Sequence, residues 1–139
     1  MCLLVHNNNE NSGVPKKAEK PIKVYKMLIN LPEGLPEGLP EAPLEAKYFT
    51  ACRFAPVIFE NGEAVLHAKI SKAKVWKGDD NLLSIEKGIH AYTDKELAEM
   101  IAKCVGAQVF EAVIPEGGMY VDGIGDEIVS DYLYIYEGK

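Results

Sequence analysis

Apolar and polar residues alternate along several segments of the chain, which is the pattern of strands that bury one face. Residues 22–30 begin with this alternation, residues 64–76 show it in the middle of the chain, and residues 128–136 show it near the end. Residues 108–115 are a further apolar run, and the proline at its end cannot continue a strand. We therefore expect a protein dominated by strands.

Two turn signals divide the middle of the chain. The pair Asn61-Gly62 favours a two-residue hairpin, because both residues accept a positive φ. Residues 77–81 contain glycine and short polar side chains and predict a second turn. Residues 47–59, before the hairpin, are apolar and aromatic, but Pro56 must interrupt a strand there or lie at a sheet edge.

One segment, about residues 94–105, follows the period of a helix. Thr93 with Glu96 three residues later forms a capping box, and Gly106 follows the segment as a C-terminal glycine does. The apolar stripe of this helix consists of Leu97, Met100, Ile101, Cys104 and Val105. We expect the stripe to pack on the sheet, with Cys104 in the core.

The strands outnumber the helix and do not alternate with it regularly, so the pattern predicts an α+β fold. We expect a mainly antiparallel sheet, either one strongly bent sheet or two small sheets, with one clear helix. A length of 139 residues fits a single domain over residues 1–139.

Two segments lack the pattern of a core element. The Asn-rich residues 7–20 predict a loop or flexible arm, because they offer almost nothing apolar to bury. The Leu-Pro-Glu-Gly repeat in residues 31–43 predicts a proline- and glycine-rich surface loop. The functional alternative for this loop is a polyproline segment that binds a partner.

Composition narrows the classes of function. The net charge of −6 argues against a general binder of nucleic acid or of anionic membranes. No apolar run approaches the ~20 residues of a membrane helix, and the start shows no export signal. We therefore expect the cytoplasm of a bacterium or of a phage-infected cell. The three cysteines and three histidines are scattered, so we expect no metal site and no cofactor.

A histidine and a tyrosine before the helix are the best local cluster of ligand-binding candidates. His90 and Tyr92 share one face of an extended segment, where they suit ligand recognition or acid–base work. Arg53 is the sole arginine of the sequence, and its planar group suits an anionic ligand. Tyr132 belongs to the alternating tyrosines of the last strand, which offer an aromatic surface. The structural alternatives are a backbone-bonded histidine, packed tyrosines and an internal ion pair of the arginine.

Two residues are candidates for catalysis. Removal of the initiator methionine would make Cys2 an N-terminal nucleophile, with the free amine as its base. Glu127 enters the last part of the chain at a strand start, where a carboxyl group can serve as an acid. The structural alternatives are an edge-strand packing residue for Cys2 and a solvated charge for Glu127.

Short motifs in the chain resemble a protein family. The motifs are the Met-Cys-Leu start, Val24-Tyr-Lys26, Gly88-Ile-His-Ala-Tyr92, Ile114-Pro-Glu-Gly117 and Ile128-Val-Ser130. Together they look like an uncharacterised family of small proteins from Bacteroides-type bacteria and tailed phages. This resemblance brings no established activity with it.

A more distant similarity, at the level of the fold, is to ADP-ribosyltransferases. The shared feature is the order of an early strand, a helix, an Ile-Pro-x-Gly segment and a strand led by glutamate. This similarity implies that Lys26, Tyr92, Glu116 and Glu127 occupy stations of an NAD site. The early strand carries Tyr25-Lys26 where those enzymes use arginine or histidine.

Three functional hypotheses follow from the sequence. The first is a small non-catalytic binding protein, bacterial or phage-encoded, that holds a nucleotide-like ligand or a host protein. Its ligand-binding candidates are Arg53, His90, Tyr92, Lys26 and Tyr132. The second is a structural protein that assembles as a homo-oligomer through its apolar strands and proline loop. The third is an ADP-ribosyltransferase-like enzyme that uses NAD.

Overall fold

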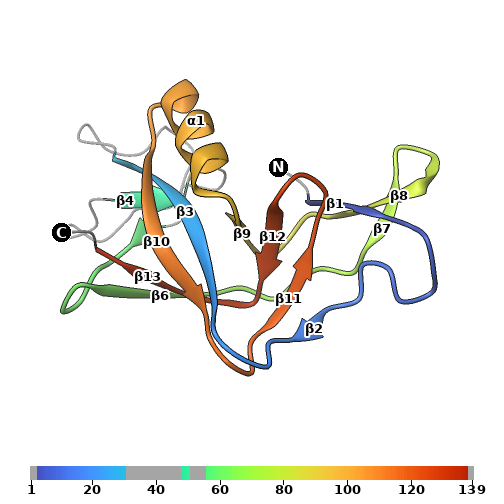
Figure 1. Cartoon of the computed structure of the whole chain (residues 1–139), viewed down its shortest axis with the longest axis horizontal. Coiled ribbons are helices and arrows are strands. Elements are labelled where there is room, and N and C mark those ends of the chain that lie inside the picture. The colour runs from blue at the N-terminus through green and yellow to red at the C-terminus, as the bar shows by residue number, and fades with distance from the viewer. Residues whose placement is uncertain (1–2, 31–47, 51–55, 138–139) are drawn as a thin grey trace.

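The computed structural model of the protein describes residues 3–30, 48–50 and 56–137 (Figure 1). Cys2, Arg53 and the predicted loop 31–43 lie outside the described residues. The described chain consists mostly of antiparallel strands with one α-helix, so the fold is broadly α+β and dominated by strands. No helix in this described part is long and apolar enough to cross a membrane.

The described strands form a large and a small sheet. The large, 10-stranded sheet has the order β2-β11-β12-β9-β3-β10-β13-β6, and β4, which pairs with β3, carries β5. Its strands are β2 (Lys16–Lys17), β3 (Ile22–Asn30), β4 (Tyr48–Thr50), β5 (Pro56–Val57), β6 (Glu63–His67), β9 (Ile89–Tyr92), β10 (Gln108–Ile114), β11 (Met119–Asp122), β12 (Glu127–Ser130) and β13 (Tyr132–Tyr136). The small sheet has the order β1-β8-β7, with β1 at Leu3–His6, β7 at Lys74–Trp76 and β8 at Asp79–Ile85.

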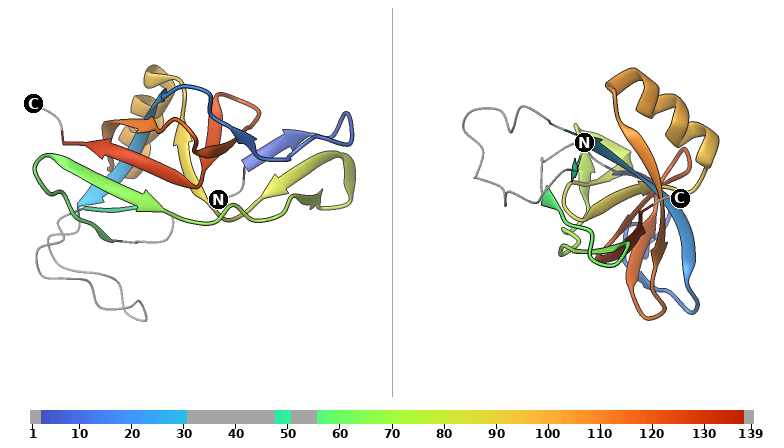
Figure 2. Two further views of the ribbon diagram at one scale, coloured as in Figure 1. Left: turned by 90° about the horizontal axis from the view of Figure 1, so that it is seen from below. Right: turned by 90° about the vertical axis from the view of Figure 1, so that its left-hand side faces the viewer.

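The large sheet turns sharply along its length. In Figure 1, β13 and β6 run across the direction of β3 and β10, and Figure 2 shows the same turn from two further sides. The inner face of the turn carries the main core. Its fully buried members include Val24, Leu28, Ala112, Ile114, Leu133 and Ile135. A second cluster, Leu3, Ile85, Val121 and Val129, joins the small sheet to β11 and β12.

Helix α1 (Lys95–Val105) lies on the outside of β3 and β10 (Figure 1). Asp94 is its N-cap, and the Asp94 side chain accepts a hydrogen bond from the backbone N–H of Glu96. The prediction of Thr93 as the cap was wrong, because the Thr93 hydroxyl donates to the carbonyl of Asp126 instead. Gly106 ends the helix in the left-handed conformation, φ 71°, as predicted.

The predicted packing face of α1 was right only in part, since Leu97 and Ile101 pack partly against the core whereas the other members of the stripe are exposed. The buried helix residues are Ala98 and Ala102, whose small side chains bring the helix close to the sheet. Met100 is 59% exposed and Val105 is 56% exposed. Cys104 is exposed as well, so it is not a core residue. The helix is therefore rotated away from the orientation that its apolar stripe predicted.

The middle of the chain follows the prediction in part. Asn61 and Gly62 have φ values of 56° and 80°, and the flanking Glu60 and Glu63 exchange two backbone hydrogen bonds, which confirms the hairpin turn. The strand expected over 64–76 is interrupted, since β6 ends at His67 and β7 begins at Lys74.

Two further parts of the chain contain secondary structure that was not predicted. Strand β8 was not predicted, although Leu82, Leu83 and Ile85 form an apolar run there. The polar residues 7–20 contain hydrogen-bonded turns and strand β2, and Ala18 is buried beside β11. The flexibility expected of these residues stays a prediction.

Candidate functional site

Two of the predicted ligand-binding residues meet between neighbouring strands. The Lys26 ammonium on β3 donates a 2.6 Å hydrogen bond to the backbone carbonyl of His90 on β9. Lys26 is only 8% exposed, so its charge lies inside the sheet rather than on a surface. The pair therefore acts first as an internal connection between the two strands.

His90 is held in its neutral form. Burial, followed by the nearby charge of Lys26, lowers the pKa of His90 to about 4. Backbone hydrogen bonds at Ile85 and Gly88 oppose this shift without cancelling it. The buried Nε2 atom of the ring has no hydrogen-bond partner among the residues that the structure describes. At neutral pH this histidine carries no charge.

Tyr92 and Glu127 are direct cross-strand partners. They lie opposite each other in the β9–β12 ladder, and Tyr25 pairs with Tyr92 on the other side. Tyr92 is buried against α1, and burial raises the pKa of the half-buried Glu127 carboxyl. The structure thus brings Lys26, His90, Tyr92 and Glu127 to adjacent strands. None of these four residues lines any of three cavities that lie among the described residues.

Tyr132 lies apart from this cluster, on the outer face of β13. Its ring stacks on the His67 ring of β6, with ring centroids 4.2 Å apart and planes inclined by 20°. Tyr132 is 40% exposed, so its outer side remains available to a partner. The structure therefore places the predicted residues at two separate locations.

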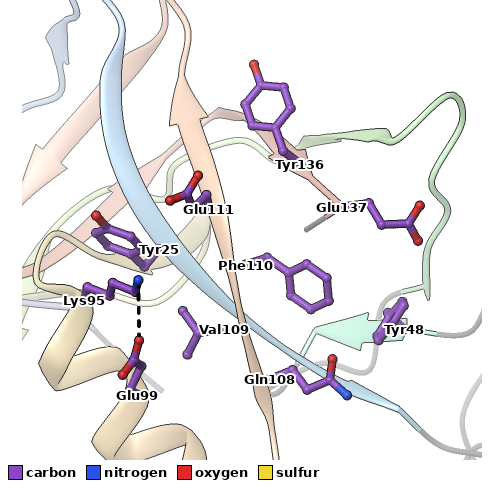
Figure 3. A pocket seen from close by; sticks show the side chains of 10 residues that line it. All are labelled: Tyr25, Tyr48, Lys95, Glu99, Gln108, Val109, Phe110, Glu111, Tyr136 and Glu137. Atoms are coloured by element: carbon purple, nitrogen blue, oxygen red, sulfur yellow. Dashed lines mark ion pairs between the residues drawn. The ribbon is translucent and has the colours of Figure 1, made fainter. Parts of the chain in front are cut away.

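A cleft of about 760 Å³ opens beside α1, over the strands that continue from this outer face (Figure 3). The described residues that line it are Tyr25, Tyr48, Lys95, Glu99, Gln108, Val109, Phe110, Glu111, Tyr136 and Glu137. They come from β3, β4, α1, β10 and the end of β13, segments that are far apart in sequence. The cleft therefore forms only because the order of the strands in the sheet brings these segments together.

The strand register builds a row of side chains across the cleft. Tyr25 of β3 lies opposite Glu111 of β10. Ala112 pairs with Ile135 in the β10–β13 ladder, and continuing that register by one residue sets Glu111 opposite Tyr136. Figure 3 shows the Glu111 carboxylate between the two tyrosines. Because neighbouring strands are ~4.8 Å apart, the tyrosine backbones are separated by roughly 10 Å.

The cleft carries negative charge. Among its described residues, Glu99, Glu111 and Glu137 supply carboxylates and Lys95 supplies an ammonium group. Lys95 is already paired with Glu99, with 3.8 Å between Nζ and Oε1 (Figure 3). No group of three potential metal ligands occurs in the described parts of the chain. The combination of aromatic rings and carboxylates is suited to an organic cation.

The centre of this cleft was not predicted from the sequence. Tyr136 belongs to the aromatic surface expected on the last strand, whereas no role was expected for the side chains of Tyr25 and Glu111. Glu111 is exposed and Tyr25 is half-buried beside α1, on the outer face of strands where polar residues are ordinary. Only the pairing of β3, β10 and β13 brings them together.

Comparison with known proteins gives no neighbour for this arrangement: no family model matches the chain, nor does a curated protein or a solved structure. The resemblance to small proteins of Bacteroides-type bacteria and phages, and the similarity to ADP-ribosyltransferases, therefore stay predictions.

Proposed function

We propose that the protein is a non-catalytic binding module that holds an arginine-bearing, positively charged segment of a partner protein in the cleft. The observation that carries this proposal is the row Tyr25–Glu111–Tyr136, in which a carboxylate lies between two aromatic side chains. A guanidinium group donates two N–H groups to one carboxylate and can lie against aromatic faces at the same time. The roughly 10 Å between the two strands of the tyrosines leaves room for one such group.

The charge of the cleft selects between the two ligand classes of the first hypothesis. The phosphates of a nucleotide would meet the carboxylates of Glu99, Glu111 and Glu137, which repel them. A basic protein segment would be attracted by the same groups, and by the net charge of −6 at longer range. The cleft therefore supports a protein partner over a nucleotide.

The cluster of Lys26, His90 and Tyr92 supports a structural role beside this site. A general acid or base must reach a substrate atom, whereas Lys26, Tyr92 and the Nε2 atom of His90 are buried. We propose that the cluster connects β3, β9 and β12 and thereby fixes the strand that carries Tyr25.

The test is the binding of a fluorescent penta-arginine peptide with blocked termini, followed by anisotropy, with penta-glutamate as the charge control. We expect saturable binding of penta-arginine that weakens with added salt, and no binding of penta-glutamate. Glu111→Gln should weaken binding by roughly tenfold, the size of a lost charge-assisted hydrogen bond.

Glu116→Gln is the matched control, because it removes the same charge from an exposed turn outside the cleft. It should change the affinity by less than about twofold. Equal effects of the two substitutions would mean that overall charge alone attracts the peptide, and the cleft proposal would then fail.

A further inference from the structure

The outer side of α1 exposes an apolar strip at Met100 and Cys104, next to Leu97 and Ile101, which pack partly against the core. Met100 is 59% exposed and Cys104 is also exposed, while Leu97 and Ile101 are only partly buried. These residues follow the spacing i, i+3, i+4 and i+7, so they form one continuous stripe along the helix. Apolar stripes of this kind are usually covered by another element.

Charged residues of opposite sign border one side of the stripe. Glu96 and Lys103 are seven residues apart, which places them on the same flank of the helix, one near each end. Neither side chain forms an ion pair within the described part of the chain. The flank thus has a negative end and a positive end.

Two copies of this flank are complementary when the helices run antiparallel, because the negative end of each then faces the positive end of the other. Consider an antiparallel pair of these helices in which the two Met100 residues lie opposite each other. Glu96 of the first copy is then four residues from this centre, and Lys103 of the second copy is three residues from it in the same direction. At 1.5 Å per residue, the two positions differ by only about 1.5 Å along the axis. Leu97 comes opposite Cys104 of the second copy by the same arithmetic.

We propose that α1 forms an antiparallel, two-fold symmetric helix pair with a second copy of this chain. Met100 lies at the symmetry axis, and two Glu96–Lys103 ion pairs border the apolar centre. Two-fold pairing uses the same surface on both copies, which is what the charge pattern requires. The contact spans only the length of one short helix, so we expect a weak dimer that forms with increasing concentration.

The apolar centre of this interface is separate from the cleft. Lys95 and Glu99 line the cleft, and the flank with Glu96 and Lys103 lies between them and the Met100–Cys104 side of the helix. Loss of the dimer is therefore measurable independently of peptide binding.

The first test is sedimentation equilibrium of the full chain over a range of concentrations. We expect a monomer–dimer equilibrium, and Met100→Glu should raise the dissociation constant at least about tenfold by placing two charges at the axis. Val65→Glu is the matched control, because Val65 is 55% exposed on β6, away from the helix. It should leave the dissociation constant unchanged.

The second test fixes the orientation of the two helices. Glu96→Lys and Lys103→Glu should each weaken the dimer, and the double variant should restore it, because both ion pairs are then re-formed with reversed sign. In a parallel two-fold pair, the charged flank of each copy would face the opposite flank of the other, so the double variant would not restore what the single variants weaken. A Met100→Cys variant should also form a disulfide between the two engineered positions on mild oxidation, identified by peptide mass spectrometry.

A chain that stays monomeric up to millimolar concentration would overturn the proposal. A dimer that survives Met100→Glu, or that Val65→Glu abolishes, would place the contact elsewhere and overturn it equally. Failure of the double charge reversal to restore association would reject the antiparallel arrangement.

Discussion

Lys23 and Glu111 form an ion pair on the outer face of the large sheet, with 3.4 Å between Nζ and Oε1. Both side chains are 60% exposed. Glu111 is the carboxylate at the centre of the proposed binding row, so a cation of the protein itself already occupies its neighbourhood. An incoming basic side chain must compete with Lys23 for this carboxylate. The Lys23–Glu111 ion pair is exposed to solvent, and such pairs contribute ~0–1 kcal/mol to stability. Replacing Lys23 by an incoming basic side chain therefore costs little free energy.

Removal of the competitor should strengthen binding. Lys23→Gln is expected to tighten penta-arginine binding by roughly two- to fivefold, because Glu111 then pairs with the peptide alone. Lys74→Gln is the control, since it removes one positive charge from the exposed strand β7 of the other sheet. Titration by anisotropy measures both. An equal gain in the two variants would point to overall charge rather than to the cleft.

The aromatic wall of the cleft should contribute through ring faces and not through its hydroxyl group. Tyr136→Leu is expected to weaken penta-arginine binding about two- to fivefold, the range of an exposed cation–π contact. Tyr136→Phe keeps the ring and should bind like the parent protein. Tyr136 is 38% exposed, so neither change should alter the folded structure, which circular dichroism checks. Weak binding by both variants would contradict the ring-face contact.

Stability should fall on acidification through the titration of His90. The pKa of His90 is about 4 in the folded protein and 6.5 in its ordinary state. The unfolded chain therefore binds a proton between these values that the folded protein does not, and stability is lost as pH falls from 6.5 to 4. The loss is at most roughly 3 kcal/mol and is reduced by the solvent that reaches the ring.

Urea unfolding at several pH values measures this effect. His90→Gln should show a flatter pH dependence than the parent protein between pH 4 and 6.5, whatever its absolute stability. The raised pKa of Glu127 acts in the opposite direction, because its protonated form is the one that folding favours. Unchanged pH dependence in His90→Gln would show that the histidine is not held neutral.

Gly88 is required by the backbone where β8 leads into β9. Its φ is 132°, and an added Cβ would lie 2.6 Å from Cγ1 of Val129. Gly88→Ala should therefore cost roughly 2–4 kcal/mol, from backbone strain and overpacking together. Gly125→Ala also has a positive φ, 76°, but its Cβ meets nothing within 4 Å, so it should cost only about 1–2 kcal/mol. Urea midpoints of the two variants distinguish these costs, and equal midpoints would contradict the contact with Val129.

Local patterns predicted those elements whose signals are local. The Asn61-Gly62 turn and the helix end at Gly106 each depend on a few adjacent residues, and the structure has them. The single strand expected over residues 128–136 was wrong, because the chain is divided at Asp131 into β12 and β13, which pair with different strands. The interrupted strand after His67 shows the limit of alternation, because a pattern with period two does not say where pairing stops.

The orientation of α1 illustrates a second limit. Periodicity shows that Leu97, Met100 and Cys104 share a face, but it does not show whether that face meets the sheet. The small Ala98 and Ala102 allow a closer approach and are the buried helix residues, while Leu97 packs only at the edge of the contact. The cleft could not be predicted for a similar reason. Tyr25 and Tyr136 are 111 positions apart in the sequence, and only the order of the strands in the sheet brings them together.

The most direct test of the proposed function is an amide NMR titration of the ¹⁵N-labelled chain with unlabelled penta-arginine. We expect the largest shift changes on Tyr25, on residues 108–111 and on Tyr136, and we expect Glu111→Gln to raise the peptide concentration at half-maximal change by roughly tenfold. Shift changes spread evenly over the acidic surface, or concentrated away from β3, β10 and β13, would contradict a cation-binding cleft.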